Sequence, residues 1–343
     1  MKKNIKGYKG LFTMLFNINK IEKGEFYFDL ALKEGDKRAA IAKSKTKGKT
    51  RLEKSRYIEI NKINIILKNL KGHLENIEKS FPSFENLPLF YKEVIDMMVG
   101  IDNLKISISS LSWLKIKSEE IGKKYIRSIR RCDKLSEIGQ LRKEFVGRLK
   151  SMIKKINKHF IYLDNVRKKF RNLPTVKINA TTYCICGCPN VGKSTLLSHL
   201  TPANPEINIY PFTTKYLMFG YIGKKIQIID TPGAFRTDLD KMNHIEKLAY
   251  LAIKHLADTI IYVFDLSETC GYSIKKQEEL FENIQNKFSN RQIIIYFSKT
   301  DLLKEDLIKK YKNKYKKYKI YTDLKFLRKS IKRNPPPPLF HME

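Results

Sequence analysis

Near the middle of the chain, glycine, lysine and serine recur at the spacing of a phosphate-binding loop. The loop consists of Gly187, Cys188, Pro189, Asn190, Val191, Gly192, Lys193 and Ser194, which fit the pattern G-x-x-x-x-G-K-[ST]. Its glycines let backbone N–H groups turn inward around phosphate oxygens, and the N-terminus of a following helix adds its positive dipole. Lys193 can reach the β- and γ-phosphates, and the Ser194 hydroxyl can bind Mg²⁺. The helix-like segment that follows starts at Thr195, which we also expect at the nucleotide.

A carboxylate that follows an apolar run marks a second candidate part of the site. The segment is Asp230, Thr231, Pro232 and Gly233, and it follows the strand-like residues 225–229. A carboxylate at a strand end can hold the water shell of Mg²⁺, so Asp230 is the candidate metal ligand beside Ser194. Gly233 can offer its backbone N–H to a γ-phosphate. The alternative is an ordinary turn built from proline and glycine.

A third polar segment follows another predicted strand, residues 292–297. It consists of Ser298, Lys299, Thr300 and Asp301. Asp301 can accept hydrogen bonds from the N1–H and the 2-amino group of guanine, which adenine does not offer. The alternative role of Asp301 is to cap the helix that follows. Because the three segments occur in this order, the sequence predicts a protein that binds and hydrolyses GTP.

Between the first two segments lies a loop, residues 210–215, with two adjacent threonines. A threonine in a mobile loop can sense the γ-phosphate through Mg²⁺, and its release on hydrolysis makes the loop a switch. Thr214 is the preferred ligand and Thr213 the second choice, while a threonine pair that merely opens the next strand is the alternative. With Lys193 and Gly233, Thr214 completes the predicted catalytic group.

The elements that position these loops are predicted to form an α/β domain over residues 173–330. After Pro174, short β-branched and aromatic runs alternate with helical patterns, which favours a mainly parallel sheet with helices on both faces. The predicted strands span residues 182–186, 216–222, 225–230, 259–265, 292–297 and 318–321. Cys184, Cys186 and Cys188 have a spacing that would also suit a metal, but a buried strand that enters the phosphate loop is favoured.

The first half, residues 1–172, is predicted to be an all-α helical bundle. Residues 51–80 and 102–131, and a long segment from about Asp133 to Asn172, place apolar residues at intervals of three and four. The residues after 330, through 343, form a proline-rich tail.

The charge of the chain points to a polyanionic partner. Its 343 residues include 68 Lys+Arg and 35 Asp+Glu, for a net charge of +33, and residues 1–180 hold +23 of it. Such an excess attracts nucleic acid or anionic membranes, although an AT-rich genome, which raises the number of lysines, is an alternative source. No apolar run approaches the roughly 20 residues of a transmembrane helix. We expect no leader peptide, and the five cysteines favour a reducing compartment.

Taken together, these segments resemble the Nog GTPases, the nucleolar GTP-binding protein family of the Obg-like group. The resemblance covers about residues 50–305 and rests on residues 81–91, 187–194, 211–215, 230–233 and 265–271. It implies hydrolysis of GTP to GDP and phosphate with Mg²⁺, as a switch in assembly of the large ribosomal subunit. It also implies binding to the precursor rRNA and ribosomal proteins of that subunit.

Several departures from the family pattern refine these expectations. Ser298 stands where the family usually has asparagine. Ala234 follows Gly233, so no glutamine there orients the attacking water, and we expect slow hydrolysis until RNA or a protein activates it. The compact length resembles archaeal members, which favours the cytoplasm over the nucleolus of a eukaryote. We expect a monomer off the ribosome with no stable membrane association. The alternatives are an RNA-binding scaffold that keeps its GTP, or a related GTPase acting on tRNA or at a membrane.

Overall fold

The computed structural model describes residues 18–44, 50–171, 173, 176–177, 180–201, 206–209, 216–231, 242–333 and 335–337. The chain divides into two compact units. One comprises Met1–Asn86 and Met98–Arg171, and the other comprises Leu87–Met97 and Asn172–Glu343. Each unit is described by itself below.

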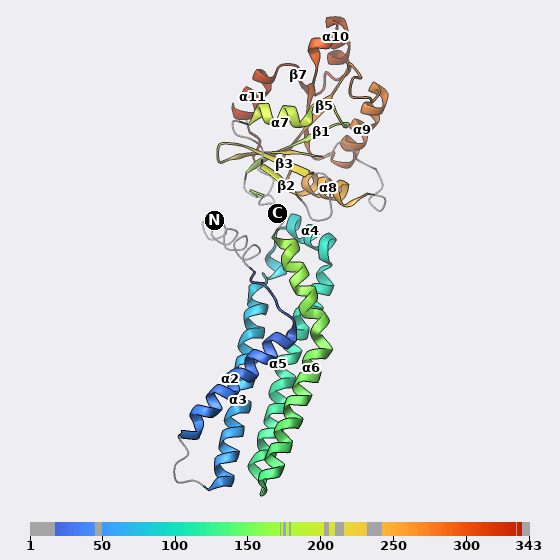
Figure 1. Cartoon of the computed structure of the whole chain (residues 1–343). Helices are drawn as coiled ribbons and strands as arrows, with labels where there is room; N and C mark the ends of the chain where they lie inside the picture. The colour runs from blue at the N-terminus through green and yellow to red at the C-terminus, as the bar shows by residue number, and fades with distance from the viewer. Residues whose placement is uncertain are drawn as a thin grey trace. The chain divides into compact units, whose positions relative to one another are not determined.

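The first unit is a bundle of long helices (Figure 1). Its helices are α2 (Gly24–Ser44), α3 (Arg51–Ser80), α5 (Ile101–Arg131) and α6 (Leu135–Phe170), with a short 3₁₀ turn, η1, at Phe84–Asn86. Helix α2 packs against α3 and α6, and α5 packs against α3 and α6. The predicted helical bundle is therefore confirmed for α3, α5 and α6, whereas α2 was not predicted.

Helix α3 shows how the sequence sets both the start and the buried face of a helix in this bundle. Its capping residue Thr50 accepts a hydrogen bond from the backbone N–H of Glu53 at 3.3 Å, and the Glu53 carboxylate accepts one from the N–H of Thr50 at 2.8 Å. This reciprocal pair satisfies donors that a helix start otherwise leaves open. The buried side chains recur every three or four residues, as one face of a helix requires. They are Ile63, Ile66, Leu70, Leu74 and Ile77.

Small residues allow close packing within the bundle. A methyl group added at Gly122 of α5 would lie 2.2 Å from Cδ1 of Leu67 on α3, so a larger residue there would force the Leu67 side chain to move. At the start of α2, a methyl group on Gly24 would lie 2.7 Å from Cγ2 of Ile153 on α6. At these two glycines, side chains of the neighbouring helices pack directly against the backbone.

Helix α4 (Leu89–Val99) differs from the predicted organisation. Although it precedes α5 in the chain, residues 87–97 belong to the second unit. The Tyr91 hydroxyl accepts a hydrogen bond from the N–H of Val176 at 2.9 Å, and the Tyr91 side chain is fully buried. Glu93 accepts a hydrogen bond from Lys254 at 2.8 Å. A boundary at residue 172 thus leaves out a helical segment of the second unit, because sequence order does not show where an apolar helix packs.

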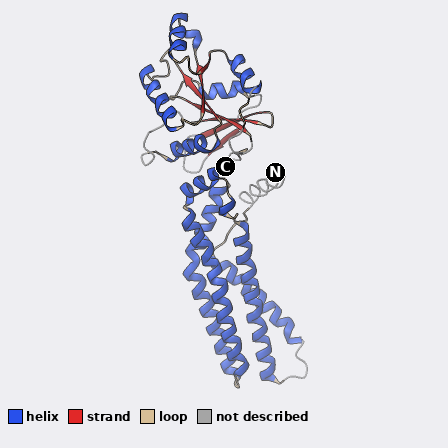
Figure 2. Cartoon of the chain, turned by 180° about the vertical axis from the view of Figure 1, so that it is seen from behind, coloured by secondary structure: helices blue, strands red, loops and turns tan. Residues whose placement is uncertain are grey.

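The second unit is built on a seven-stranded sheet (Figure 2). The strands are β1 (Thr181–Cys186), β2 (Glu206–Ile209), β3 (Tyr216–Ile222), β4 (Ile226–Asp230), β5 (Thr259–Phe264), β6 (Gln292–Phe297) and β7 (Lys319–Tyr321). Their order is β2-β3-β4-β1-β5-β6-β7. Strands β4, β1, β5, β6 and β7 pair in parallel, while β2 and β3 form an antiparallel edge. The mainly parallel sheet is confirmed, and β2 is a strand that was not predicted.

Helices cover both faces of this sheet. They are α7 (Lys193–Leu200), α8 (His244–Leu256), α9 (Ile274–Lys287), α10 (Glu305–Lys314) and α11 (Leu324–Arg333). On one face, Leu197 of α7 and Leu327 of α11 join a core with Ile185 of β1. On the other, the Tyr262 ring of β5 contacts Phe281 of α9. Among the described residues, no helix is long and apolar enough to cross a membrane.

Candidate functional site

The phosphate loop connects the end of β1 to the start of α7, as predicted. Three residues of the loop have positive φ angles: Gly187 at +148°, Asn190 at +61° and Gly192 at +96°. A methyl group at Gly187 would lie 2.6 Å from the carbonyl oxygen of Val263 in β5, so the chain passes this point only as glycine. The left-handed angles turn the chain sharply before Lys193 begins the helix. The sequence motif therefore forms the strand–loop–helix connection that a phosphate site needs.

Lys193 reaches back across the loop. Its Nζ donates a hydrogen bond to the Cys188 carbonyl at 2.7 Å, and the side chain is 7% exposed. Burial lowers the pKa of the Lys193 ammonium, while the nearby Asp230 carboxyl opposes that shift. The lysine thus lies within the loop rather than in solvent, where its charge interacts strongly with any anion that the loop binds.

Ser194 and Asp230 come together as the predicted metal-binding pair. Asp230 ends β4 and is the register partner of Ile185 in β1, so it lies beside the start of the phosphate loop. The Ser194 hydroxyl donates to Oδ2 of Asp230 at 2.6 Å. The other carboxylate oxygen, Oδ1, is buried and has no hydrogen-bond partner within the described part of the chain. Burial raises the pKa of Asp230, against the effects of the Ser194 hydroxyl and the Lys193 ammonium.

This pair fits Mg²⁺ by the chemistry of its oxygens. Mg²⁺ is held in proteins by one or two carboxylate or hydroxyl oxygens together with water and substrate phosphates. The Ser194 hydroxyl and the buried Oδ1 of Asp230 are such a set. A divalent cation there would also stabilise the charged form of a carboxyl that burial disfavours.

Thr231, a residue predicted to lie at the nucleotide, directly follows β4. Its hydroxyl donates to the Ile185 carbonyl at 2.7 Å, and its side chain is 1% exposed. The described contacts of the side chain therefore tie the end of β4 to β1. Of the other predicted loop residues, Val191 is fully buried, whereas the side chain of Thr195 is exposed on the first turn of α7. The predicted switch and turn residues lie outside the described residues: Thr213, Thr214, Pro232, Gly233 and Ala234.

The predicted guanine loop lies next to the phosphate loop. A methyl group at Gly192 would lie 3.9 Å from Cβ of Ser298. The Ser298 backbone N–H and hydroxyl both donate to the Phe264 carbonyl of β5, at 2.9 and 3.1 Å. Lys299 has a left-handed φ of +50°, and the 3₁₀ turn η3 (Thr300–Leu302) follows it with Asp301 exposed. The described parts of the predicted site therefore meet at the carboxyl edge of β1, β4 and β6.

One carboxylate beside this loop was not predicted as a site residue. Asp265 follows β5 and is fully buried, and its Oδ2 lies 2.7 Å from Nζ of Lys299. The available signal was its position, because Asp265 directly follows the buried strand β5, much as Asp230 ends the buried strand β4. The structure also shows where the three cysteines around the phosphate loop lie. Cys184 and Cys186 lie in β1 and Cys188 in the loop, all buried, which confirms the predicted strand.

Comparison with known proteins places the chain in a family. The family model of the NOG1 N-terminal helical domain matches residues 17–177, and that of nucleolar GTP-binding protein 1 (NOG1) matches residues 244–301. The uncharacterized protein MJ1408 of Methanocaldococcus jannaschii is 40% identical over 258 residues, which cover 75% of this chain and 73% of that protein. The chain belongs to the NOG1 family. The resemblance inferred from the motifs is confirmed.

Other NOG1 relatives are much longer than the matched region. Nucleolar GTP-binding protein 1 of Eremothecium gossypii is 33% identical over 261 residues, which cover 75% of this chain and 41% of that protein. This chain thus spans less than half of that relative. A crystal structure named for the Plasmodium falciparum protein is 33% identical, covers 43% of this chain and 78% of that one, and has a TM-score of 0.34. The NOG1 match over residues 244–301 includes Asp265 and the guanine loop.

Proposed function

We propose that this NOG1-family protein binds GTP and hydrolyses it to GDP and phosphate as a conformational switch in assembly of the large ribosomal subunit. The observation that carries the proposal is the meeting of the phosphate loop, the Ser194–Asp230 pair and the guanine loop at one edge of the sheet. Relatives named nucleolar GTP-binding protein 1 support it.

The chemistry follows from the residues at this edge. Water attacks the γ-phosphorus, a new P–O bond forms, and the bond to the bridging oxygen of GDP breaks. Lys193 and the loop N–H groups stabilise the negative charge on the phosphoryl oxygens. Ser194 and Asp230, with Thr214 of the switch loop, would hold Mg²⁺, which neutralises phosphate charge. Asp301 would accept hydrogen bonds from guanine. With Ala234 in place of glutamine, turnover is slow until RNA or a protein partner orders the water.

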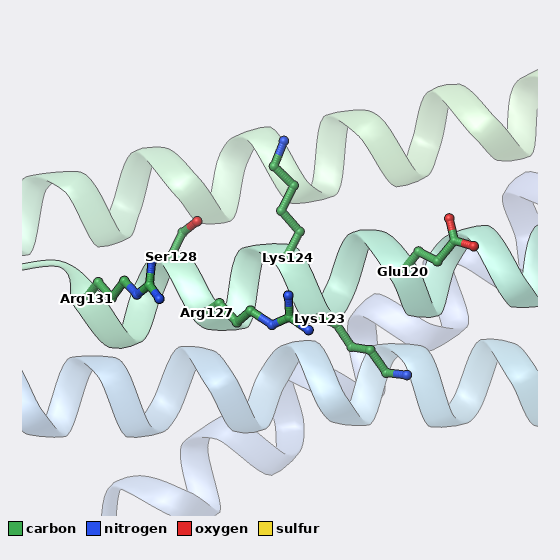
Figure 3. Close-up of a pocket in the computed structure, with 6 residues that line it drawn as sticks. All are labelled: Glu120, Lys123, Lys124, Arg127, Ser128 and Arg131. Atoms are coloured by element: carbon green, nitrogen blue, oxygen red, sulfur yellow. The ribbon is translucent and has the colours of Figure 1, made fainter.

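The helical unit supplies a surface for RNA. The exposed side chains Lys123, Lys124, Arg127 and Arg131 line a surface depression of about 440 Å³ along α5 (Figure 3). Within the described part of the chain, none of the four forms an ion pair, whereas the acidic lining residue Glu120 is paired with Lys117 at 2.7 Å. The positive charge is therefore free to attract phosphates. A-form RNA is bound mainly through its shape and its phosphates, which such a surface can contact.

Cosedimentation with large-subunit precursor particles tests the assembly role. We expect binding that differs between GTP, GDP and no nucleotide, and that weakens steeply as salt rises. A variant with both Lys123→Glu and Arg127→Glu should bind the particles more weakly than the unaltered protein. The matched control is Lys275→Glu with Lys276→Glu on exposed positions of α9, which carries the same change of charge. Binding that is unaffected by salt, by the nucleotide and by the α5 substitutions would contradict the assembly role. It would leave the proposal of GTP binding untouched.

Single-turnover hydrolysis separates the switch from the scaffold. We expect slow release of phosphate by the protein alone, and acceleration when precursor particles are added. GTP that stays bound and intact in the presence of particles would instead identify an RNA-binding scaffold. Recruitment by tRNA or by liposomes, with no response to ribosomal particles, would point to the other two classes of partner.

A further inference from the structure

The loop after β5 lies beside the guanine loop after β6. Phe264 and Phe297, the last residues of these parallel strands, are register partners. Ser298 extends the pairing because its backbone N–H donates to the Phe264 carbonyl at 2.9 Å. Asp265 and Lys299 therefore leave the sheet side by side, and Lys299 turns toward Asp265.

The Asp265 carboxylate is surrounded by donors. Its Oδ1 accepts hydrogen bonds from the N–H of Ser267, at 3.0 Å, and from the Ser267 hydroxyl. Its Oδ2 accepts from the N–H of Cys270 at 2.9 Å and from the hydroxyl of Thr269 at 3.1 Å. Lys299 Nζ completes the set at 2.7 Å. A buried carboxylate is tolerated only with such complete pairing.

The backbone of Asp265 is fixed as well. Its N–H donates to Oε1 of Gln277 at 2.9 Å, and Nε2 of Gln277 donates back to the Asp265 carbonyl at 2.9 Å. Gln277 lies on α9 and is fully buried. Asp265 is therefore a rigid point of the fold, fixed from both its main chain and its side chain.

Lys299 has two oxygen partners, both in the β5 loop. Besides Asp265, its Nζ donates to the Thr269 hydroxyl at 2.8 Å. Ser298, which replaces the asparagine usual in the family, contacts the Phe264 carbonyl through its hydroxyl and backbone N–H. Its described contacts thus tie the loop only to the strand behind it. The forward part of the loop, which presents Asp301, depends on Lys299.

We propose that Asp265 is a positioning residue for guanine recognition: it holds Lys299, and thereby sets the turn that presents Asp301 to the base. This inference rests on the proposed binding of guanine nucleotide. Asp265 acts through Lys299 and is not itself a contact to the nucleotide.

The test compares GDP with IDP, which lacks the 2-amino group that Asp301 would bind. We expect the full-length protein to bind GDP more tightly than IDP. Asp265→Asn removes the charge that holds Lys299 and keeps the shape of the side chain, so the IDP/GDP ratio, the dissociation constant of IDP divided by that of GDP, should fall by about tenfold. Thr269→Val, at an exposed position, removes the other partner of Lys299 and should lower the ratio by about threefold.

Glu278→Gln is the matched control, because it makes the same change from carboxylate to amide at a residue of α9 that pairs with a different lysine, Lys314. We expect it to leave the IDP/GDP ratio of dissociation constants unchanged. A folded Asp265→Asn variant with the ratio of the unaltered protein overturns the inference. If that variant does not fold, an unchanged ratio in Thr269→Val overturns it. Failure of the unaltered protein to bind either nucleotide would instead refute the proposed function, and the inference with it.

Discussion

Strands β4 and β5, which lie on either side of β1 in the sheet, lead to buried aspartates that behave in opposite ways. Asp230 at the end of β4 keeps one buried oxygen without a partner in the described part of the chain, and burial raises its pKa. At Asp265 after β5, burial also acts to raise the pKa, but hydrogen bonds from Lys299, Ser267 and Thr269 outweigh it and lower the pKa to about 2. The number of donors, rather than burial, separates the two. A buried carboxylate oxygen without a hydrogen-bond donor is suited to bind a cation. A carboxylate with donors to both oxygens is suited to hold neighbouring loops together.

The largest expected effect is on stability and comes from removing the Asp265 carboxylate. Asp265→Ala leaves the Lys299 ammonium and the backbone N–H groups of Cys270 and Ser267 in a site built around a carboxylate, so the free energy of unfolding should fall by about 3 kcal/mol or more. Urea unfolding of the variant and the unaltered protein measures it. A loss below about 1 kcal/mol would show that water replaces the carboxylate and that the site is not a rigid tie.

Removing the charge at the other aspartate should affect catalysis instead of folding. In Asp230→Asn, an oxygen can still accept from Ser194, but the cation loses a charged partner, so single-turnover GTP hydrolysis should slow by about 10–100-fold. The free energy of unfolding should stay equal or rise, because the variant no longer buries a carboxyl whose charged form burial disfavours. A large loss of stability with unaltered hydrolysis would reverse the roles assigned to the two aspartates.

The difference between the aspartates lies beyond what sequence patterns show. Both were visible as carboxylates after apolar strands, and the motif around Asp230 made that residue a candidate site member. The donors around Asp265 include Lys299, which is 34 positions away in the chain, so they meet only once β5 and β6 pair. Local patterns predicted β1, β4, β5 and β6 well because each is a short run rich in β-branched, aromatic or other apolar residues, and α3 because its apolar residues recur every three or four positions.

Other elements were missed for the same physical reason. Helix α2 begins at Gly24 and contains Gly35, residues that weaken an isolated helix. Contacts with other helices account for both, since a methyl group at Gly35 would lie 2.8 Å from Cγ1 of Ile66. Strand β2 has four residues and gives too short a pattern. Helix α4 has a clear apolar face, but the sequence does not show against which unit that face packs. Tertiary contacts decide this.

As the pH falls, the contributions of the two aspartates to the free energy of unfolding should change in opposite directions. A carboxyl with a lowered pKa stabilises the fold above its unfolded value and loses that contribution as pH falls through its folded value. Asp265 should therefore lose about 2 kcal/mol between pH 4 and pH 2. The difference in unfolding free energy between the unaltered protein and Asp265→Asn should shrink over this range. For Asp230, whose pKa is raised, protonation favours the folded state, so any advantage of Asp230→Asn at neutral pH should vanish in acid. Parallel curves for both variants would contradict the assignment.

A third carboxylate, Glu93, is paired but not buried, and we expect such a pair to contribute little to the free energy of unfolding. Glu93 of α4 accepts a hydrogen bond from Lys254 at 2.8 Å and lies 3.1 Å from Nε2 of His255, but its side chain is 38% exposed. Burial acts to raise its pKa, and the hydrogen bonds from Lys254 and His255 outweigh it, so the pKa is lowered as at Asp265. Because water screens this pair, Glu93→Gln should lower the free energy of unfolding by less than about 1 kcal/mol. A loss as large as that of Asp265→Ala would mean that the number of donors alone decides stability, and burial would drop out of the comparison.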